Sequence, residues 1–284
     1  MRSFLSTLVG SFAHPAAENP TVAIVQASFE ATGVDARYIN CDVLPDALGD
    51  AVRGAVAQGW RGFNCSLPHK VAVVPLLDEL AESAQIIGAV NCVVIRDGRL
   101  IGENTDGRGF VEAMRELRDP AGQEVVIFGA GGAARAIAVE LALGGASRIT
   151  IVNRDKARGE ALAGLVADST DASSTFVEWV GDFALPASAD IVVNATSVGL
   201  YPDVHARVAV EQSTFLPRML VADVITNPPR TRFLGEAEAS GCATIDGQGM
   251  LANQAAVALQ LWTGIDADKD AMRRELRSLF PGEN

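Results

Sequence analysis

The stretch Glu124–Leu143, EVVIFGAGGAARAIAVELAL, decides the fold. A strand-like run enters a Gly-rich turn that begins at Gly129, and an amphipathic helix pattern leaves it. Strand, G-x-G-x-x-A turn and helix in this order predict a dinucleotide-binding unit, with a Gly-rich structural turn as the alternative. Glycine lets the backbone approach a pyrophosphate, the small Ala134 permits close helix packing, and the helix N-terminus attracts phosphate. The predicted cofactor contacts in this turn are Gly129, Ala130, Gly131, Gly132 and Ala133.

The next strand, RITIVN, ends at Asn153, which is 24 residues after Gly129. Enzymes that use NAD place an acidic residue near this point to bind the ribose hydroxyls. Here Asn153 is followed by Arg154, and Arg158 lies one helical turn further on. Because a guanidinium can hold a 2′-phosphate, NADP is the predicted cofactor, with a solvated charged turn as the alternative interpretation. Asp155 would repel that phosphate, which keeps NAD as a second option.

Strand-like and helix-like runs alternate on both sides of this unit, which predicts an α/β fold with parallel sheets and crossover helices. The predicted strands begin at Thr7, Ala36, Trp60, Glu124, Arg148, Asp190 and Met219. One stretch breaks the rhythm, because Asp97-Gly98 between two short apolar runs predicts a β-hairpin. The polar residues 166–175 predict a surface loop. We place the change of domain near Thr105.

Charge and cysteine content exclude several classes of protein. The 284 residues carry 23 basic and 35 acidic side chains, a formal charge of −12, which disfavours nucleic acids and anionic membranes as partners. No apolar run reaches the length of about 18 residues expected of a membrane span. The four cysteines and three histidines show no metal-ligand spacing, so we expect no metal site. Reduced structural thiols and a cytoplasmic location follow as expectations.

Six further motifs flank the Gly-rich turn. They are GFNCSLPHK (62–70), GAVN (88–91), GENTD (102–106), NATSVG (from Asn194), DVITNPPRT (from Asp223) and GQGMLANQ (247–254). This ordered set resembles the shikimate dehydrogenase family over nearly the whole chain. The resemblance implies two α/β domains. Residues 1–104 plus 245–284 would form a substrate-binding domain, and residues 105–244 a Rossmann-type, doubly wound dinucleotide-binding domain.

The resemblance implies that Lys70 and Asp106 form the catalytic pair. Hydride transfer to a ketone builds negative charge on oxygen, so the reaction needs a nearby cation and a proton. An ammonium at Lys70 supplies both, and Asp106 can orient the reacting hydroxyl. Taken singly, Lys70 could be a surface lysine and Asp106 a helix N-cap.

The resemblance also implies residues for substrate and cofactor. Amides and a hydroxyl that would bind ring hydroxyls are Asn64, Ser66, Asn91 and Gln254. Residues that would line the cofactor are Thr196, Ser197, Val198, Gly247 and Met250, although Met250 could equally be core filler.

Two departures from the family pattern concern the substrate carboxylate, and a third is a conservative replacement in the motif 62–70. The family usually has an S-x-S-P segment after the first strand, whose hydroxyls hold the carboxylate. This chain lacks the pair: one alignment puts Asn19 and Thr21 there, and another puts Ala16 and Glu18 there. A second carboxylate contact, usually Tyr, is Thr226 here, and Ser66 replaces the usual Thr.

The expected function is therefore NADP-dependent, reversible reduction of 3-dehydroshikimate to shikimate, as in aromatic amino-acid and chorismate biosynthesis. In the alternative, the carboxylate site is rebuilt and the chain acts on quinate, an amino-shikimate or another cyclic polyol. A non-catalytic dinucleotide or metabolite sensor is a third reading. The expected partners are small molecules, and the chain would be a monomer or homodimer.

Overall fold

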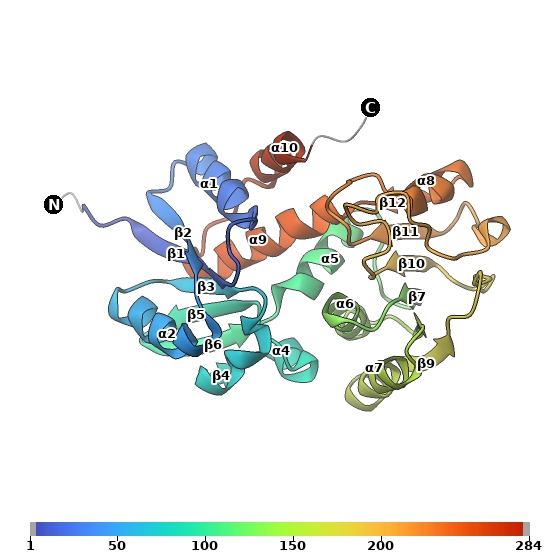
Figure 1. Ribbon diagram of the computed structural model, residues 1–284, viewed down its shortest axis with the longest axis horizontal. Helices are drawn as coiled ribbons and strands as arrows, with labels where there is room; N and C mark the ends of the chain where they lie inside the picture. The colour runs from blue at the N-terminus through green and yellow to red at the C-terminus, as the bar shows by residue number, and fades with distance from the viewer. Residues whose placement is uncertain (1–3, 281–284) are drawn as a thin grey trace. The chain divides into compact units, whose positions relative to one another are not determined.

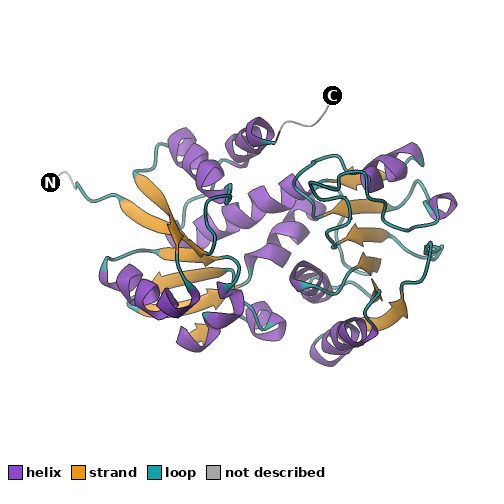
Figure 2. Cartoon of the chain, in the orientation of Figure 1, coloured by secondary structure: helices purple, strands orange, loops and turns teal. Residues whose placement is uncertain are grey.

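The computed structural model describes residues 4–280, and their contacts divide into two compact units (Figure 1). The first unit comprises the chain up to Thr105 together with Ala252–Leu279, and the second is built on Asp106–Leu251. The sequence places the second crossing near residue 245, a few residues earlier. Each unit holds a six-stranded sheet with helices packed on it (Figure 2).

The first sheet has the order β2-β1-β3-β5-β6-β4. Its strands are β1 (Thr7–Ala13), β2 (Ala36–Asp42), β3 (Gly62–Cys65), β4 (Glu79–Leu80), β5 (Cys92–Arg96) and β6 (Arg99–Glu103). β1 lies between β2 and β3 and is parallel to both, whereas β5 and β6 form the antiparallel hairpin predicted around Asp97-Gly98. The carboxyl ends of the three parallel strands therefore meet at one edge of the sheet.

Helices cover both faces of this sheet. They are α1 (Thr21–Thr32), α2 (Leu48–Ala57), α3 (His69–Ala72), α4 (Glu82–Ile87), α10 (Lys269–Leu279) and the greater part of α9 (Gly247–Thr263). α1 begins just beyond β1, ends on the left-handed Gly33 and packs against α10. α2 buries Leu48, Val52 and Ala55 against Phe12 and Phe63 of the sheet.

The second sheet is parallel throughout and has the order β12-β11-β10-β7-β8-β9. Its strands are β7 (Glu124–Phe128), β8 (Arg148–Asn153), β9 (Ser173–Glu178), β10 (Ile191–Asn194), β11 (Leu220–Asp223) and β12 (Ala243–Ile245). The strand order reverses between β7 and β10, and ligands of such sheets bind at the carboxyl ends beside that reversal. This is the predicted doubly wound arrangement.

Successive side chains of β7 point to opposite faces of the sheet and pack into two hydrophobic cores. Val125 and Ile127 pack under α5 (Thr105–Arg115), α6 (Gly132–Leu143) and α7 (Lys156–Ser169). Val126 and Phe128 pack on the other face with Phe233 of α8 (Arg232–Ala239). Because both faces are covered, these strands read as continuous apolar runs.

The prediction of a loop over residues 166–175 is wrong. α7 continues to Ser169, and β9 begins at Ser173. The stretch is polar because β9 is an edge strand whose side chains are mostly exposed, and this polarity resembles that of a loop. Phe176 nevertheless packs against the buried core.

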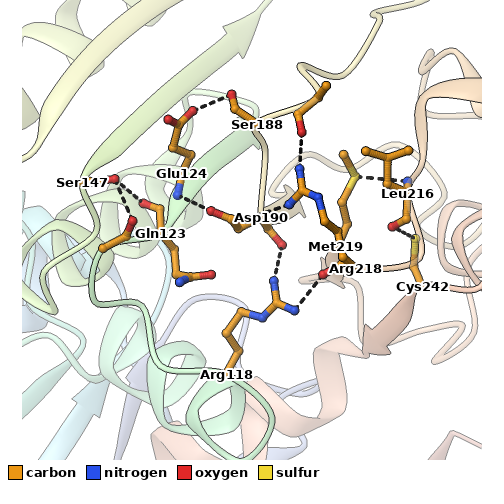
Figure 3. A network of polar contacts seen from close by, with 12 residues as sticks. Arg118, Gln123, Glu124, Ser147, Ser188, Asp190, Leu216, Arg218, Met219 and Cys242 are labelled. Carbon is orange, nitrogen blue, oxygen red and sulfur yellow. Dashed lines mark hydrogen bonds and ion pairs between the residues drawn. The ribbon is translucent and has the colours of Figure 1, made fainter.

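Charged side chains tie together the amino edge of the second sheet (Figure 3). Asp190, just before β10, accepts hydrogen bonds from Arg218 (2.8 Å) and from the N–H of Glu124 (3.0 Å). Arg118 donates to the carbonyls of Asp190 (2.9 Å) and Arg218 (2.7 Å), and Ser188 donates to the Glu124 carboxylate (2.7 Å). These bonds hold together the loops that enter β7, β10 and β11.

Two whole-chain expectations concern membranes and thiols. Within residues 4–280, no helix has the length and apolar character needed to cross a membrane. Cys41, Cys65, Cys92 and Cys242 are all free, as predicted, and all but Cys41 are buried.

Candidate functional site

A row of three polar residues crosses the carboxyl edge of the first sheet. Ser11 of β1 lies in register with Asn40 of β2 on one side and with Asn64 of β3 on the other. Ser11 is fully buried and donates to Asn40 Oδ1 at 2.6 Å. A buried polar group needs a hydrogen-bond partner, and Asn40 supplies one for Ser11. The sequence analysis missed Ser11 and Asn40, although a polar residue near the end of each predicted strand was a visible signal.

Asn19 completes the first end of this row. Its Nδ2 donates to Ser11 Oγ (3.2 Å) and to Asn40 Oδ1 (3.4 Å), and its Oδ1 accepts from the N–H of Thr21 (3.1 Å). Thr21 is the first residue of α1. Of the residues that the two alignments offer, Asn19, Thr21 and Ala16 lie at the polar row, where the carbonyl of Ala16 accepts from Asn40, whereas Glu18 is exposed.

Tyr38, a second residue that the sequence analysis missed, carries the network to the hairpin side. Its buried hydroxyl donates to Asn64 Oδ1 at 2.9 Å, and burial raises the Tyr38 pKa well above its usual range. The hydroxyl therefore stays protonated. Asn64 Nδ2 in turn donates to the carbonyl of Asn91 at 3.0 Å.

Asn91, Thr105 and Gln254 form the far end of the network. Asn91 Oδ1 accepts from the N–H of Thr105 (2.6 Å), and Asn91 Nδ2 donates to Thr105 Oγ1 (3.0 Å). Gln254 Oε1, on α9, lies 3.3 Å from Thr105 Oγ1 and 3.5 Å from Asn91 Nδ2. The structure thus brings four residues predicted from sequence, Asn19, Asn64, Asn91 and Gln254, into one array.

Lys70 follows this array along the chain. Ser66, just beyond β3, is tied to β1 by its N–H, which donates to the carbonyl of Phe12 at 3.0 Å. His69 begins the short α3 and is fully buried, with Nε2 2.8 Å from the carbonyl of Val43. The carbonyl of Lys70 accepts from the N–H of Val90 at 2.8 Å. Backbone bonds on both sides therefore fix the Lys70 main chain.

Asp106 belongs to the second unit and occupies the first turn of α5. Because α5 already begins at Thr105, Asp106 lies inside the first turn and not at the N-cap position considered from sequence, although an acidic residue there still interacts favourably with the helix dipole. Lys70 belongs to the first unit.

The Gly-rich turn lies at the strand-order reversal of the second sheet. Gly129 has φ +111°, and a Cβ there would lie 2.8 Å from the carbonyl oxygen of Ala195. A Cβ built on Gly131 or Gly132 would meet no atom within 4 Å, so the face above the turn is open. α6 starts at Gly132 without a side-chain cap, which leaves its first N–H groups for an anion. These features fit a pyrophosphate.

A buried carboxylate shapes the neighbouring loop after β10. Asp223 accepts from Asn194 Nδ2 (3.1 Å to each oxygen), Thr231 Oγ1 (2.7 Å) and the N–H of Ile225 (3.0 Å). Asn194 Oδ1 then accepts from Thr196 Oγ1 at 2.7 Å. Burial raises the pKa of Asp223 to about 6, against the lowering effect of these bonds. Asp223, which sequence analysis did not single out, therefore holds the segment of Thr196, Ser197 and Val198.

The charged residues at the predicted 2′-phosphate contact, Arg154, Asp155 and Arg158, have different partners. Asp155 caps α7 by accepting from the N–H of Arg158 at 3.1 Å, and its carboxylate lies 3.5 Å from Arg158 Nε. Arg154 instead places its guanidinium 5.9 Å from the ring centre of Trp179. Asn153 Nδ2 bonds the carbonyl of Asp155. The carboxylate that disfavoured NADP thus has a structural role in starting α7.

Gly247 and Met250 have packing roles that the sequence left open. A Cβ on Gly247 would lie 2.4 Å from the carbonyl oxygen of Ile225, so α9 can start there only with glycine. Met250 is partly buried against the core under α6. Among residues 4–280, no group of His, Cys, Asp and Glu is placed to hold a metal ion.

Family models match three segments of the chain. The shikimate dehydrogenase substrate-binding domain matches residues 12–93, shikimate/quinate 5-dehydrogenase matches 112–231, and the shikimate 5′-dehydrogenase C-terminal domain matches 247–277. The chain is 41% identical to the shikimate dehydrogenase (NADP(+)) of Methanopyrus kandleri, over 94% of each chain. It is 40% identical to that of Desulforamulus reducens, over 94% of this chain and 93% of the relative.

A solved structure extends the comparison to another substrate. The ligand-free 5-ketofructose reductase of Gluconobacter sp. strain CHM43 is 55% identical, with a TM-score of 0.96, over 98% of this chain and 100% of that one. The predicted fold, with its Rossmann-type domain, is confirmed. The chain belongs to the shikimate dehydrogenase family, whose members are NAD(P)-dependent oxidoreductases that act on CH–OH groups.

Proposed function

We propose that this chain catalyses the NADP-dependent, reversible reduction of a ketone to a secondary alcohol on a small polyhydroxylated substrate. The reduction of 3-dehydroshikimate to shikimate is the first candidate reaction. The observation that carries the proposal is the array from Asn64 through Asn91 to Gln254, whose amide groups suit ring hydroxyls. The curated relatives, which are shikimate dehydrogenases that use NADP(+), support the same assignment.

Residues of the second unit would hold the cofactor. The turn at Gly129–Gly132 and the start of α6 fit the pyrophosphate, and the loop at Thr196–Val198 would lie against the nicotinamide half. Arg154, with Arg158 one turn away, is the candidate for the 2′-phosphate. When bound, NADPH would supply the hydride.

Lys70 and Asp106 would handle charge and proton at the substrate. The ammonium of Lys70 stabilises the negative charge that develops on the carbonyl oxygen and donates the proton that completes the alcohol. Asp106 orients the reacting hydroxyl. In the oxidative direction the same groups accept the proton. The remaining array holds the ring so that one carbonyl faces the reacting groups.

A second candidate is a neutral polyhydroxy ketone. Two observations favour it: the 55% identity to 5-ketofructose reductase, and the absence of the serine pair that holds the substrate carboxylate elsewhere in the family. Quinate and amino-shikimates remain alternatives with the same reaction type. The same proposal places the enzyme in the cytoplasm, where its four free thiols would stay reduced.

Replacing the lysine tests the proposed chemistry. Lys70→Ala should lower kcat by about 100-fold or more, because the oxyanion loses its cation and proton donor. Lys269→Ala, on α10, is the matched control and should change kcat less than about twofold. NADPH consumption gives the rate, and NADPH fluorescence gives cofactor binding. Undiminished turnover by Lys70→Ala would exclude the assigned role. Cofactor binding without turnover of any polyol by the unaltered protein would favour the sensor.

A further inference from the structure

We propose that the edge formed by Asn19, Ser11 and Asn40 binds an uncharged, hydroxyl-bearing end of the substrate. The preferred substrate would then be a neutral polyhydroxy ketone of hexose size rather than a ring carboxylic acid. This inference rests on the proposed ketone reduction and deepens it by assigning the substrate class. It is carried by the hydrogen-bond polarity of the edge and by the charges around it.

The hydrogen bonds of the edge leave one donor and one acceptor on its two half-buried amides for a ligand. Ser11 gives its hydroxyl proton to Asn40 Oδ1 (2.6 Å), and Asn40 Nδ2 donates to the carbonyl of Ala16 (2.7 Å). Asn19 directs its Nδ2 to Ser11 and Asn40. Asn40 Oδ1 thus accepts two bonds already, whereas Asn40 Nδ2 keeps one N–H and Asn19 Oδ1, which accepts from the N–H of Thr21, keeps one lone pair. A sugar hydroxyl can both donate and accept, so it can use both groups, whereas a carboxylate only accepts and is repelled by the remaining lone pair.

The surroundings of the edge are acidic rather than basic. Arg37 is the only Lys or Arg between Arg2 and Arg53 in the sequence, and its guanidinium lies near Asp35, at the opposite end of β2. Asp42 lies two residues beyond Asn40, and Glu18 precedes Asn19. His14 faces the Asp42 carboxylate, with its Nδ1 2.7 Å from Asp42 Oδ1, so it adds no net positive charge to this edge. A bound carboxylate would therefore meet no cationic side chain on β1, β2 or the segment between β1 and α1, and at the start of α1 the N–H of Thr21 is already taken by Asn19 Oδ1.

Exposure indicates which groups a ligand can reach. Asn19 and Asn40 are half-buried, whereas Ser11 lies fully buried between them and Asn64. The two amides therefore form the contact surface, and Ser11 positions both of them. Beyond Ser11 the network continues through Tyr38 and Asn64 toward Gln254, and none of these side chains carries a charge at neutral pH.

The first test compares two substrates with the unaltered protein. 5-Keto-D-fructose, a neutral diketone, and 3-dehydroshikimate, a carboxylate, are assayed separately with NADPH. We expect kcat/KM at least about tenfold higher for the diketone, since one lost or mismatched polar contact changes affinity by that order. A preference for 3-dehydroshikimate would overturn this inference and leave the proposed reaction intact. Failure to reduce either compound, with NADPH still bound, would overturn both.

Variants locate the preference. Asn19→Ser combined with Thr21→Ser recreates the S-x-S spacing and should lower the diketone-to-carboxylate ratio of kcat/KM by about tenfold or more. Ser11→Ala should raise KM for the diketone about tenfold with kcat changed less than about threefold. Ser6→Ala, just before the same strand, is the control and should alter neither value. An unchanged ratio in the double variant, with the protein folded by circular dichroism, would contradict the assignment of this edge.

Discussion

The two edges of the second sheet use polar residues in opposite ways. At the amino edge, Asp190 is partly exposed and faces the guanidinium of Arg218 (Figure 3). At the carboxyl edge, the hydrogen-bond partners of the buried Asp223 are the amide of Asn194, the hydroxyl of Thr231 and backbone N–H groups. An exposed ion pair holds loops together and changes the free energy of unfolding little, because its charges stay solvated. A buried carboxylate surrounded by neutral donors fixes a single loop geometry, but its burial costs desolvation free energy. The polar residues of the carboxyl edge therefore serve to position the loop after β10 more than to stabilise the fold.

Substitution of the two glycines that flank β7 should give the largest difference between the two edges. Gly122 lies before the strand and Gly129 after it, and both have positive φ. A Cβ at Gly122 would meet nothing within 4 Å, whereas one at Gly129 would press on Ala195. Gly129→Ala should therefore lower the free energy of unfolding by about 2–3 kcal/mol and NADPH affinity at least about tenfold.

Gly122→Ala is the matched control for backbone strain alone. It should lose about 1 kcal/mol and leave NADPH affinity unchanged. Urea unfolding and fluorescence titration with NADPH measure the two quantities. Equal losses of affinity in both variants would mean that strain, not the crowding of Ala195, sets cofactor binding.

The buried carboxylate offers the second test. Asp223→Asn places an amide against groups that all donate, so buried donors lose acceptors, and we expect a loss of about 1–3 kcal/mol at neutral pH. The NADPH affinity should fall as well, because Asn194 then no longer fixes Thr196. Asp190→Asn, at the other edge, should cost less than about 1 kcal/mol and leave the affinity unchanged.

The pH dependence of stability distinguishes the same two residues. The folded-state pKa of Asp223 is raised from 3.8 to about 6, so the folded protein binds this proton more tightly than the unfolded chain. Its contribution to stability is therefore greatest below pH ~4 and is lost as the pH rises toward ~6. Asp223→Asn should abolish this part of the pH profile of unfolding, whereas Asp190→Asn should retain it. A wild-type slope that persists in Asp223→Asn would assign the effect to another group.

The sequence predicted what depends on local pattern. The Gly129 turn, the hairpin at Asp97-Gly98 and the predicted strand starts are local features, and the family resemblance supplied the site residues. The partners of those residues were not visible, because Ser11 and Asn40 are 29 residues apart and meet only through strand register. Asp223 and Asn194 are separated by the same interval and meet in the same way. The capping role of Asp155 was readable from its place before a helix, yet it was weighed only as a charge beside a phosphate.

The smallest change in unfolding free energy is expected for a substitution at the amino edge. Arg218→Met removes the ion pair with Asp190, whose partners are 45% and 27% exposed, so the loss of unfolding free energy should be about 0.5–1 kcal/mol. Added salt should shrink the difference from wild type, since screening weakens only the charged contribution. NADPH affinity should stay constant. Arg218 also donates to the carbonyl of Ala187, and water can replace that bond only if the carbonyl is accessible. If Arg218→Met instead lowers the unfolding free energy by more than about 2 kcal/mol at every salt concentration, the guanidinium satisfies buried carbonyls. The amino edge would then also be fixed by hydrogen bonds rather than by charge.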